Sequence, residues 1–389
     1  MKNWKMYLVA LLRAAINEME PDTPPDGLDW EALYQLADYH SVACTAYYGI
    51  VRLPKENQPE PEILNKFQKA MQLVLGREAM QHFELQGVLD TFEENGIVCV
   101  PLKGWLMKHL YPRPDMRSMC DVDILVRSED MGKIPDLMKE HGFEMEDHGE
   151  NHDGYMKPPF LSTEIHWALF GPRSPYEAYF APMIEKVHPV EGKQYESRMT
   201  WEDFYLHLIA HMAKHFDNCG TGLRSFMDVY LFREKFRDQL DEVYLQEELE
   251  KLGLRKFTGV MEEMAHCMFA EGLPEEERNR YETLNEFVFH TGTYGTKETD
   301  VTAQLTNHAA HKGKYLVSRF FPNLDFMKIQ YPVLEKAPVL LPVFWVARGF
   351  RSVFLRRERL SAELRMVKKA DESMIQEMEE IKRLSGLIQ

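Results

Sequence analysis

Residues 117–126 read RSMCDVDILV, in which two aspartates stand one residue apart at the start of an apolar run. Aspartate is a poor strand former and is costly to bury without a partner. In a strand, alternate side chains share a face, so Asp121 and Asp123 would point to one side and Val122 to the other. Their α-carbons would lie about 6.6 Å apart, which suits a shared cation. The simpler interpretation is that both acids begin a strand in solvent, paired with lysine or arginine.

A third carboxylate favours cation binding over a pair of solvated acids. The segment LSTEIHWAL at 161–169 alternates apolar and polar residues, and this pattern places Glu164 on the same face as His166. If the two strands are neighbours, about 4.8 Å apart, the three acids converge on one spot. Three like charges there would be unstable without a counter-ion. The cluster of Asp121, Asp123 and Glu164 therefore predicts a site for Mg²⁺ or Mn²⁺.

The chain around this cluster divides into three parts by its hydrophobic pattern. Helical spacing runs from 1 to about 95, short strands alternate with helices over 96–199, and helical spacing returns over 200–389. This pattern predicts an α+β fold, with a small mixed β-sheet core flanked by N-terminal and C-terminal helical regions. Within the core we expect strands at 97–102, 121–126, 143–149 and 155–170, and helices at 103–111 and 128–143.

Composition narrows the classes of function. The chain has 389 residues, with 62 acidic against 46 basic ones and a net charge of −16, which makes nucleic acid an unlikely partner. Its five cysteines form no CxxC pair, so neither a disulfide framework nor a zinc knuckle is indicated, and we expect a cytoplasmic protein. No GxSxG, P-loop, GxGxxG, HRD or DFG motif occurs.

Two segments of the chain are apolar enough to raise the question of membrane contact. Residues 1–20 lack a small-residue cleavage site and predict an amphipathic first helix. The segment APVLLPVFWVA at 337–347 is shorter than the roughly 20 residues of a membrane span, so it predicts a buried or surface-packed helix and no transmembrane segment. Peripheral membrane contact remains an alternative because of the arginines that follow, Arg348, Arg351, Arg356, Arg357 and Arg359.

The turn between the first predicted strand and its helix is a candidate anion site. It reads PLKG at 101–104, where backbone N–H groups at a helix start attract an anion. Gly104 would let a phosphate approach closely, Lys103 would add positive charge, and Arg117 could reach the same phosphates. Each signal is weak alone, since an arginine before an acidic pair more often forms a salt bridge.

These residues resemble a known family. The stretch LKGWLMKHLYPRPDMRSMCDVDILV at 102–126, followed by TEIHWAL at 163–169, is similar to an uncharacterised bacterial nucleotidyltransferase family of the DNA polymerase β-like nucleotidyltransferase superfamily. That superfamily is marked by a glycine turn, a strand with two acids and a later strand with a third. The resemblance continues at 208–216, 224–232 and 319–334.

The resemblance implies a metal-dependent transfer of a nucleoside monophosphate from a nucleoside triphosphate to a small-molecule or protein acceptor. Asp121 and Asp123 would hold two ions, and Glu164 would hold the ion that activates the acceptor hydroxyl and act as its base. The superfamily usually has Gly-Ser at the phosphate turn, whereas this chain has Lys103 and Gly104 followed by Trp105. This departure leaves a second hypothesis open, a catalytically inactive nucleotide-binding regulatory module of the same fold.

Three histidines recur every fourth residue on one predicted helix face. Zinc binding by His207, His211 and His215 is conceivable, but no partner acid or cysteine motif accompanies them, and packing is the commoner reason for such spacing. The resemblance favours a third possibility, a pocket for the acceptor. Its predicted lining residues are His166, His211, His215, Arg224 and Asp228.

Overall fold

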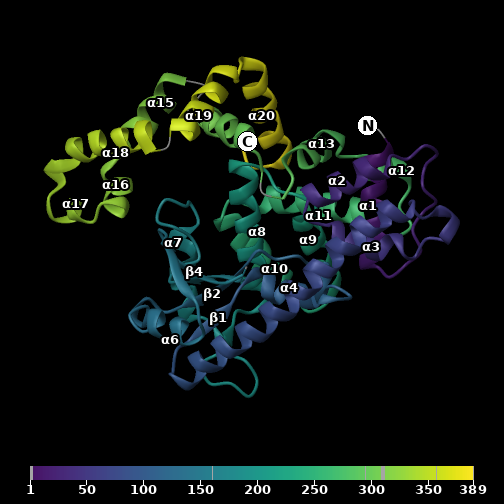
Figure 1. Cartoon of the computed structure of the whole chain (residues 1–389), viewed down its shortest axis with the longest axis horizontal. Helices are drawn as coiled ribbons and strands as arrows, with labels where there is room; N and C mark the ends of the chain where they lie inside the picture. The colour runs from purple at the N-terminus through teal and green to yellow at the C-terminus, as the bar shows by residue number, and fades with distance from the viewer. Residues whose placement is uncertain (1–2, 160, 294, 308–311, 356, 389) are drawn as a thin grey trace.

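The computed structural model describes residues 3–159, 161–293, 295–307, 312–355 and 357–388. It is a mixed α+β structure, as the pattern predicts, in which a five-stranded sheet lies among helices from both ends of the chain (Figure 1). The strands of this sheet are β1 (Cys99–Pro101), β2 (Asp121–Val126), β3 (Glu144–His148), β4 (His152–Lys157) and β5 (Leu161–His166). A separate two-stranded sheet pairs β6 (His188–Pro189) with β7 (Ser197–Arg198).

The sheet order is β1-β2-β5-β4-β3. The central strands β2 and β5 are parallel, and every other pair is antiparallel. In the register of the central pair, Asp123 lies opposite Glu164 and Asp121 lies opposite Ser162. This register puts the acids of the two strands on one face of the sheet.

One predicted strand is wrong. The stretch 155–170 was expected to form a single strand, but it divides into β4, which starts earlier at His152, and β5. The break falls at Pro158 and Pro159, which have no backbone N–H to donate to a sheet. Beyond the break, Lys157 pairs with Leu161. The interruption turns the chain back and adds a strand to the sheet.

The helices of the core are shorter than predicted. The helix expected at 103–111 consists of α5 (Lys103–Met107) and a 3₁₀ turn at 108–110. The one expected at 128–143 consists of a 3₁₀ turn at 128–130 and α6 (Ile134–Glu140). A further short helix, α7 (Glu177–Phe180), follows the sheet.

The N-terminal helices are α1 (Asn3–Ile16), α2 (Trp30–Tyr39), α3 (Ala43–Ile50) and α4 (Pro61–Glu94). The first is a core helix and not the amphipathic one expected, because every residue from 7 to 16 is buried. Helix α4 is about 50 Å long and joins two hydrophobic clusters. Phe67 in its first half packs with α1 and α3, whereas Val88 and Phe92 in its second half pack on the sheet.

The two faces of the sheet have different surroundings. Val122, Ile124 and Ile165 point to α4 and α6 and form one hydrophobic cluster. Leu125, on the opposite face, joins the larger cluster that includes residues of α8 and α9. The acids of β2 alternate with the first set, so they point toward the C-terminal helices. The expected division at 95 and 199 stays a prediction.

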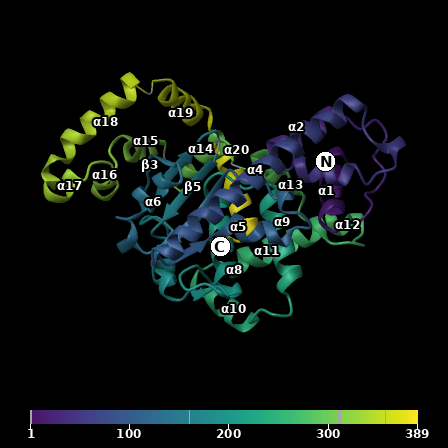
Figure 2. The ribbon, with the colours of Figure 1, turned by 60° about the horizontal axis from the view of Figure 1, so that its bottom comes forward.

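The C-terminal region is helical throughout its described residues (Figures 1 and 2). Helices α8 to α11 pack beside the sheet and α1, and α20 returns to contact α13 and α14. Helices α15 to α18 extend away from this body. The bounds are α8 (Trp201–Asn218), α9 (Leu223–Phe236), α10 (Glu242–Lys251), α11 (Arg255–Phe269), α12 (Glu275–Arg278), α13 (Glu282–Thr291), α14 (Lys297–Asn307), α15 (Lys312–Phe320), α16 (Leu324–Gln330), α17 (Val333–Lys336), α18 (Leu341–Leu355), α19 (Arg357–Lys369) and α20 (Glu372–Ser385).

The apolar segment at 337–347 forms a 3₁₀ turn at 338–340 and then the first seven residues of α18. Across the described part of the chain, every helix is too short or too polar to cross a bilayer.

Candidate functional site

The structure brings the three predicted acids together. Asp121, Asp123 and Glu164 each offer one carboxylate oxygen, and these oxygens lie within 4.8 Å of one another. The parallel register of β2 and β5 is the cause, because it sets Glu164 beside Asp123 on the same face. Asp121 is exposed at the end of its strand, and the other two acids are half-buried. Their catalytic roles stay predictions.

Lys103 supplies the nearest positive charge. The chain leaves β1 with the Leu102 N–H donating to the Asp123 carbonyl oxygen at 2.9 Å. The next residue, Lys103, has a φ of +26°, a strained value for a side-chain-bearing residue. In this conformation its Nζ lies 3.1 Å from Asp123 Oδ2. The phosphate turn predicted from sequence therefore directs its lysine onto the acid pair.

His166 also contacts the acids. Its Nε2 lies 3.2 Å from Asp123 Oδ1 and 3.3 Å from Glu164 Oε2. The Asn151 amide donates to His166 Nδ1 at 3.3 Å and to the Ala168 carbonyl oxygen at 2.7 Å. This arrangement leaves Nε2 to donate to the carboxylates. Burial lowers the pKa of His166, but its hydrogen bonds to the two acids outweigh burial and raise it.

The carboxylates differ in their electrostatics. For Asp123, burial acts to raise the pKa, but the charge of Lys103 and the hydrogen bond from His166 hold it well below its usual range. For Asp121, displacement of water by the surrounding protein and repulsion from Asp123 and Glu164 raise the pKa, although the side chain reaches solvent. One acid is thus neutralised by protein groups, and the other still lacks compensating charge.

Arg117 is buried next to Gly104 of the turn, and its contact with phosphate stays a prediction. Its Nε and Nη2 donate to the two carboxylate oxygens of Asp228 at 2.8 and 2.7 Å, and the Tyr111 hydroxyl donates to the same acid at 2.8 Å. A Cβ on Gly104 would lie 2.6 Å from Arg117 Nη1 and 2.5 Å from the sulfur of Met119. A larger residue at this position would have to displace both side chains, so Gly104 leaves room for them.

The predicted acceptor residues on α8 and α9 do not all face the acids. Arg224 donates to the Ser118 carbonyl oxygen at 2.7 Å, and Asp228 is engaged by Arg117, so these two residues hold the chain just before β2. The His211 and His215 Nε2 atoms lie 3.1 Å apart. Burial, with the nearby positive charge of Lys103, lowers the pKa of His215 to about 4. A role at an acceptor pocket stays a prediction for all four residues, His211, His215, Arg224 and Asp228.

Packing explains the position of His207, the remaining histidine of the series on α8. His207 is fully buried, and its ring packs edge-on against the rings of Phe170 and Phe180. Burial holds its pKa well below the usual value. Among the described residues, the side chains close enough to share a metal ion do not include this histidine series. The zinc alternative thus has no support from the geometry.

Comparison with known proteins decides the family. A family model described as "Uncharacterised nucleotidyltransferase" matches residues 26–270, more than half of the chain. The chain belongs to this nucleotidyltransferase family. The match includes the three acids and the phosphate turn, and it ends before 319–334, where the sequence resemblance was expected to continue.

Other comparisons add little to this assignment. A solution structure of the antibiotic-resistance factor ANT(2'')-Ia is similar at 12% identity, over 54% of this chain and 97% of that one, with a TM-score of 0.26. That score is too low to carry an argument. No curated protein matches the chain.

Two residues near the three acids were not predicted from the sequence. His152 Nε2 lies 3.7 Å from Glu164 Oε1, and His152, Glu164 and His166 form a second group that could hold a metal ion. A hairpin at Pro158 and Pro159 would have predicted it, since such a turn sets His152 opposite His166.

Lys214 of α8 is the second missed residue. Its side chain reaches solvent, yet the surrounding protein and the charge of Lys103 lower its pKa, while Glu164 acts in the opposite direction. Lys214 is therefore close enough to Lys103 and Glu164 for their charges to affect it. Lys214 lies three residues after His211 and one before His215, outside the four-residue spacing of the histidines, so no local pattern predicted it.

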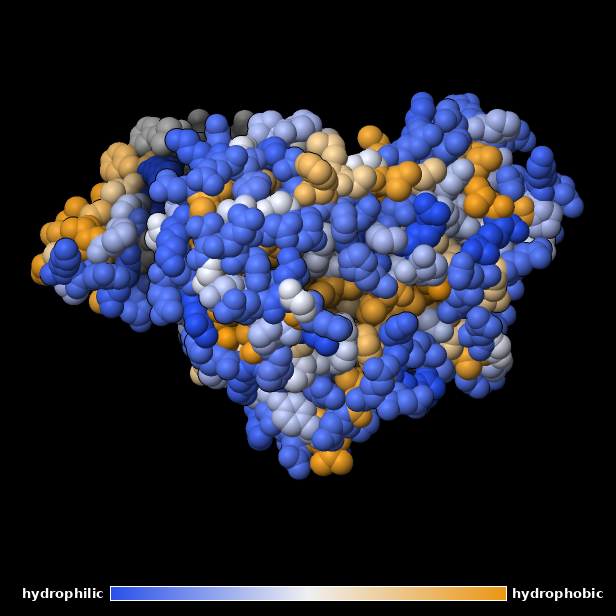
Figure 3. All heavy atoms as spheres, turned by 90° about the horizontal axis from the view of Figure 1, so that it is seen from below, coloured by the Kyte–Doolittle hydropathy of each residue, from blue (hydrophilic) through white to orange (hydrophobic). Residues whose placement is uncertain are grey.

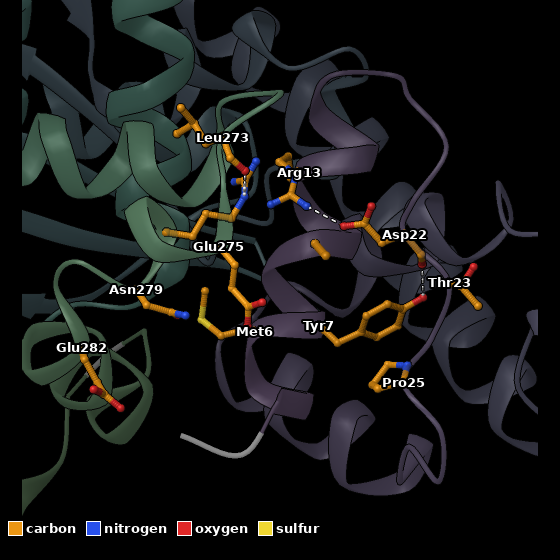
Figure 4. Close-up of a pocket in the computed structure, with 12 residues that line it drawn as sticks. Met6, Tyr7, Arg13, Asp22, Thr23, Pro25, Leu273, Glu275, Asn279 and Glu282 are labelled. Carbon is orange, nitrogen blue, oxygen red and sulfur yellow. Dashed lines mark hydrogen bonds and ion pairs between the residues drawn. The ribbon is translucent and has the colours of Figure 1, made fainter.

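A separate cavity lies away from the three acids. About 450 Å³ opens between α1, the segment at 22–25 and α12, and it is lined by Tyr7, Arg13 and Asp22 among others (Figure 4). Arg13 is already paired with Asp22 at 2.9 Å, and none of the lining residues belongs to the five-stranded sheet. The cavity is therefore separate from the acids.

Proposed function

We propose that this nucleotidyltransferase moves a nucleoside monophosphate from a nucleoside triphosphate to a small-molecule or protein acceptor, with Mg²⁺ or Mn²⁺ at the three acids. The observation that carries the proposal is the convergence of Asp121, Asp123 and Glu164 within 4.8 Å at the edge of the sheet, in a chain of this family. The acidic charge of the whole chain favours an acceptor other than a polynucleotide.

The donor set fits a hard divalent cation. All three side chains offer carboxylate oxygens, the ligands that Mg²⁺ and Mn²⁺ prefer. The raised pKa of Asp121 is a sign of repulsion that a cation would relieve. Bound there, such ions would polarise the phosphoryl oxygens and lower the pKa of an attacking hydroxyl.

The residues of the chain then divide the work. Asp121 and Asp123 would hold the cations, and Glu164 would hold the ion that activates the acceptor hydroxyl and take the hydroxyl proton. The acceptor oxygen forms a bond to the α-phosphorus as the bond to the β-phosphate oxygen breaks, and pyrophosphate leaves. Lys103 and Lys214 bind the triphosphate from either side, which replaces the contact of the absent serine. His166 positions Asp123 and Glu164 by hydrogen bonds to both.

A second candidate function is a nucleotide-binding regulatory module without turnover. The ion pair of Lys103 with Asp123 favours it, because a lysine already occupies one of the two aspartates. The absence of serine after Gly104 favours it as well.

Pyrophosphate release separates the two functions. The purified protein is incubated with Mg²⁺, each triphosphate labelled at its α-phosphate, and pools of small-molecule and protein acceptors. We expect label in an acceptor together with pyrophosphate for the native chain, loss of both for Glu164→Gln, and retention for Glu144→Gln, a matched control on exposed β3 of the same sheet. A chain that binds a non-hydrolysable triphosphate by calorimetry, but never transfers label, would support the module.

A further inference from the structure

The distribution of charge along the chain is uneven. Residues 312–369, which include α15 to α19, carry thirteen lysines and arginines against four acids, a net charge of +9. Because the whole chain has a net charge of −16, the remainder carries −25. A strongly basic segment on an acidic protein is a candidate contact for an anionic partner.

The same segment exposes apolar side chains in a regular array. Val343 and Val346 are 62% and 60% exposed, and their spacing of three residues puts them on one side of α18. Val339, in the 3₁₀ turn just before this helix, is 84% exposed. Val317 of α15 is 60% exposed as well. Figure 3 shows hydrophobic surface at the end of the molecule that carries α17 and α18.

The exposure of this face is a consequence of packing on the other side of α18. Trp345 Nε1 donates to the Pro322 carbonyl oxygen at 2.9 Å, and its ring packs edge-on against Phe321. The Phe344 ring packs against Tyr331 at 4.6 Å. Because these aromatic residues fix α18 against the segments before it, the valines are held outward.

We propose that this basic arm, defined as residues 312–369, binds the surface of an anionic phospholipid bilayer. A helix with an apolar side and basic residues nearby lies in the plane of the lipid headgroups, with its apolar side chains at the acyl boundary. Lys336, three residues before Val339, and Arg351, five residues after Val346, are both exposed and can supply the charge that attracts anionic headgroups. The described helices are too short or too polar to cross the bilayer, so the contact is peripheral.

Other occupants fit the arm less well. A nucleic-acid backbone would satisfy the positive charge but not three outward valines. A second copy of this chain would offer negative charge from its acidic body, but it too would have to cover the valines. A bilayer provides both the negative surface and the apolar layer beneath it.

Vesicle flotation tests the proposal with the full chain. We expect the native protein to float with phosphatidylcholine vesicles containing about 30% phosphatidylglycerol and to bind pure phosphatidylcholine at least about tenfold more weakly. Raising the salt from about 0.1 to 0.5 M should release most of it, because the headgroup attraction is screened. Equal binding to both vesicle types, or no flotation with either, would overturn the proposal.

Variants assign the contact to the arm. The double variant Val343→Asp with Val346→Asp should lower binding at least about tenfold, and Lys336→Gln with Arg351→Gln should lower it about fivefold for each charge removed. Val243→Asp is the matched control, since this valine is 70% exposed on α10 and should leave binding unchanged.

Each variant is compared with the native chain by thermal unfolding, and the charge variant keeps the test valid if the aspartates disturb folding. Undiminished flotation of both arm variants contradicts the proposal. So does a native dimer that the aspartates convert to monomer without any vesicle binding, which would assign the face to a second copy. Binding of duplex DNA in place of vesicles would assign it to nucleic acid.

Discussion

The site of Asp121, Asp123 and Glu164 on β2 and β5, called the sheet edge, and the basic arm carry opposite charges. The fold also distributes these charges differently in the two regions. At the sheet edge, three carboxylates are brought together by strand register, and Lys103 and His166 neutralise part of their charge. In the arm, positive charges are spread along 58 residues, from 312 to 369, beside outward apolar side chains. The first arrangement concentrates charge on one point, as chemistry on a phosphate requires. The second spreads it over a surface, as contact with an extended partner requires.

This difference teaches that the net charge of −16 describes neither region. The body, which holds the three acids, carries −25 and the arm +9, so the argument against nucleic acid applies to the body and not to the arm. Two independent functions on one chain should therefore respond to different substitutions.

The largest expected effect separates the two regions completely. Replacing Asp123 with Asn should lower nucleotidyl transfer about a thousandfold or more, because it removes one cation ligand and the partner of Lys103. Vesicle binding should not change. Acceptor labelling and flotation are measured on the same preparation, with Glu144→Gln as the control for each. A variant that retains full transfer would refute the role of the acids.

Acid should destabilise the body through its buried histidines. His40 is fully buried, with Nε2 3.3 Å from the Phe289 carbonyl oxygen and Nδ1 accepting from the Leu223 N–H at 3.4 Å. Burial lowers its pKa from 6.5 to about 4. Below pH 6.5 the unfolded chain therefore binds a proton that the folded chain does not, and the free energy of unfolding falls by on the order of 3 kcal/mol by pH 4.

Urea unfolding at several pH values measures this loss. Above pH 6.5 the histidine contributes no slope. His40→Gln should flatten the decline between pH 6.5 and 4, whereas His188→Gln, at an exposed position on β6, should leave it as it is. An identical slope in His40→Gln would show that the buried imidazole is not the cause.

A smaller effect tests the phosphate contact proposed for Lys214. Lys214→Met should raise the KM for the triphosphate about tenfold with little change in kcat, because one charge-assisted phosphate contact is lost. Initial rates at several triphosphate concentrations separate the two parameters. Lys251→Met, in the last turn of α10, is the control and should match the native chain. A fall in kcat alone would place Lys214 at the reacting atoms and not at the phosphates.

The smallest expected effect is no effect at all. Val343→Asp should leave transfer to a dissolved acceptor unchanged, since the arm contributes none of the acids. A loss of transfer in solution would mean that the arm shapes the site, and the comparison between the two regions would fail.

The pattern of residue types in the sequence predicts local features, but it does not predict contacts between residues that are far apart in the sequence. The strand at 121–126 and the shared face of its acids follow from alternation, which depends only on neighbouring residues. Pro158 and Pro159 divide the single strand predicted at 155–170, and the hairpin that results brings His152 opposite His166. The pairing of Arg117 with Asp228 joins residues 111 positions apart, and no local rule predicts which acid a buried arginine meets.

The ion pair between Lys103 and Asp123 has a thermodynamic consequence. A divalent ion that enters at Asp123 must displace the ammonium, so the empty protein should bind the metal weakly. Triphosphate that accepts Lys103 would free the aspartate, and by reciprocity the metal would then strengthen binding of the nucleotide. Under the proposed function, either ligand alone would leave the site half-assembled, and nucleotide and metal together would complete it.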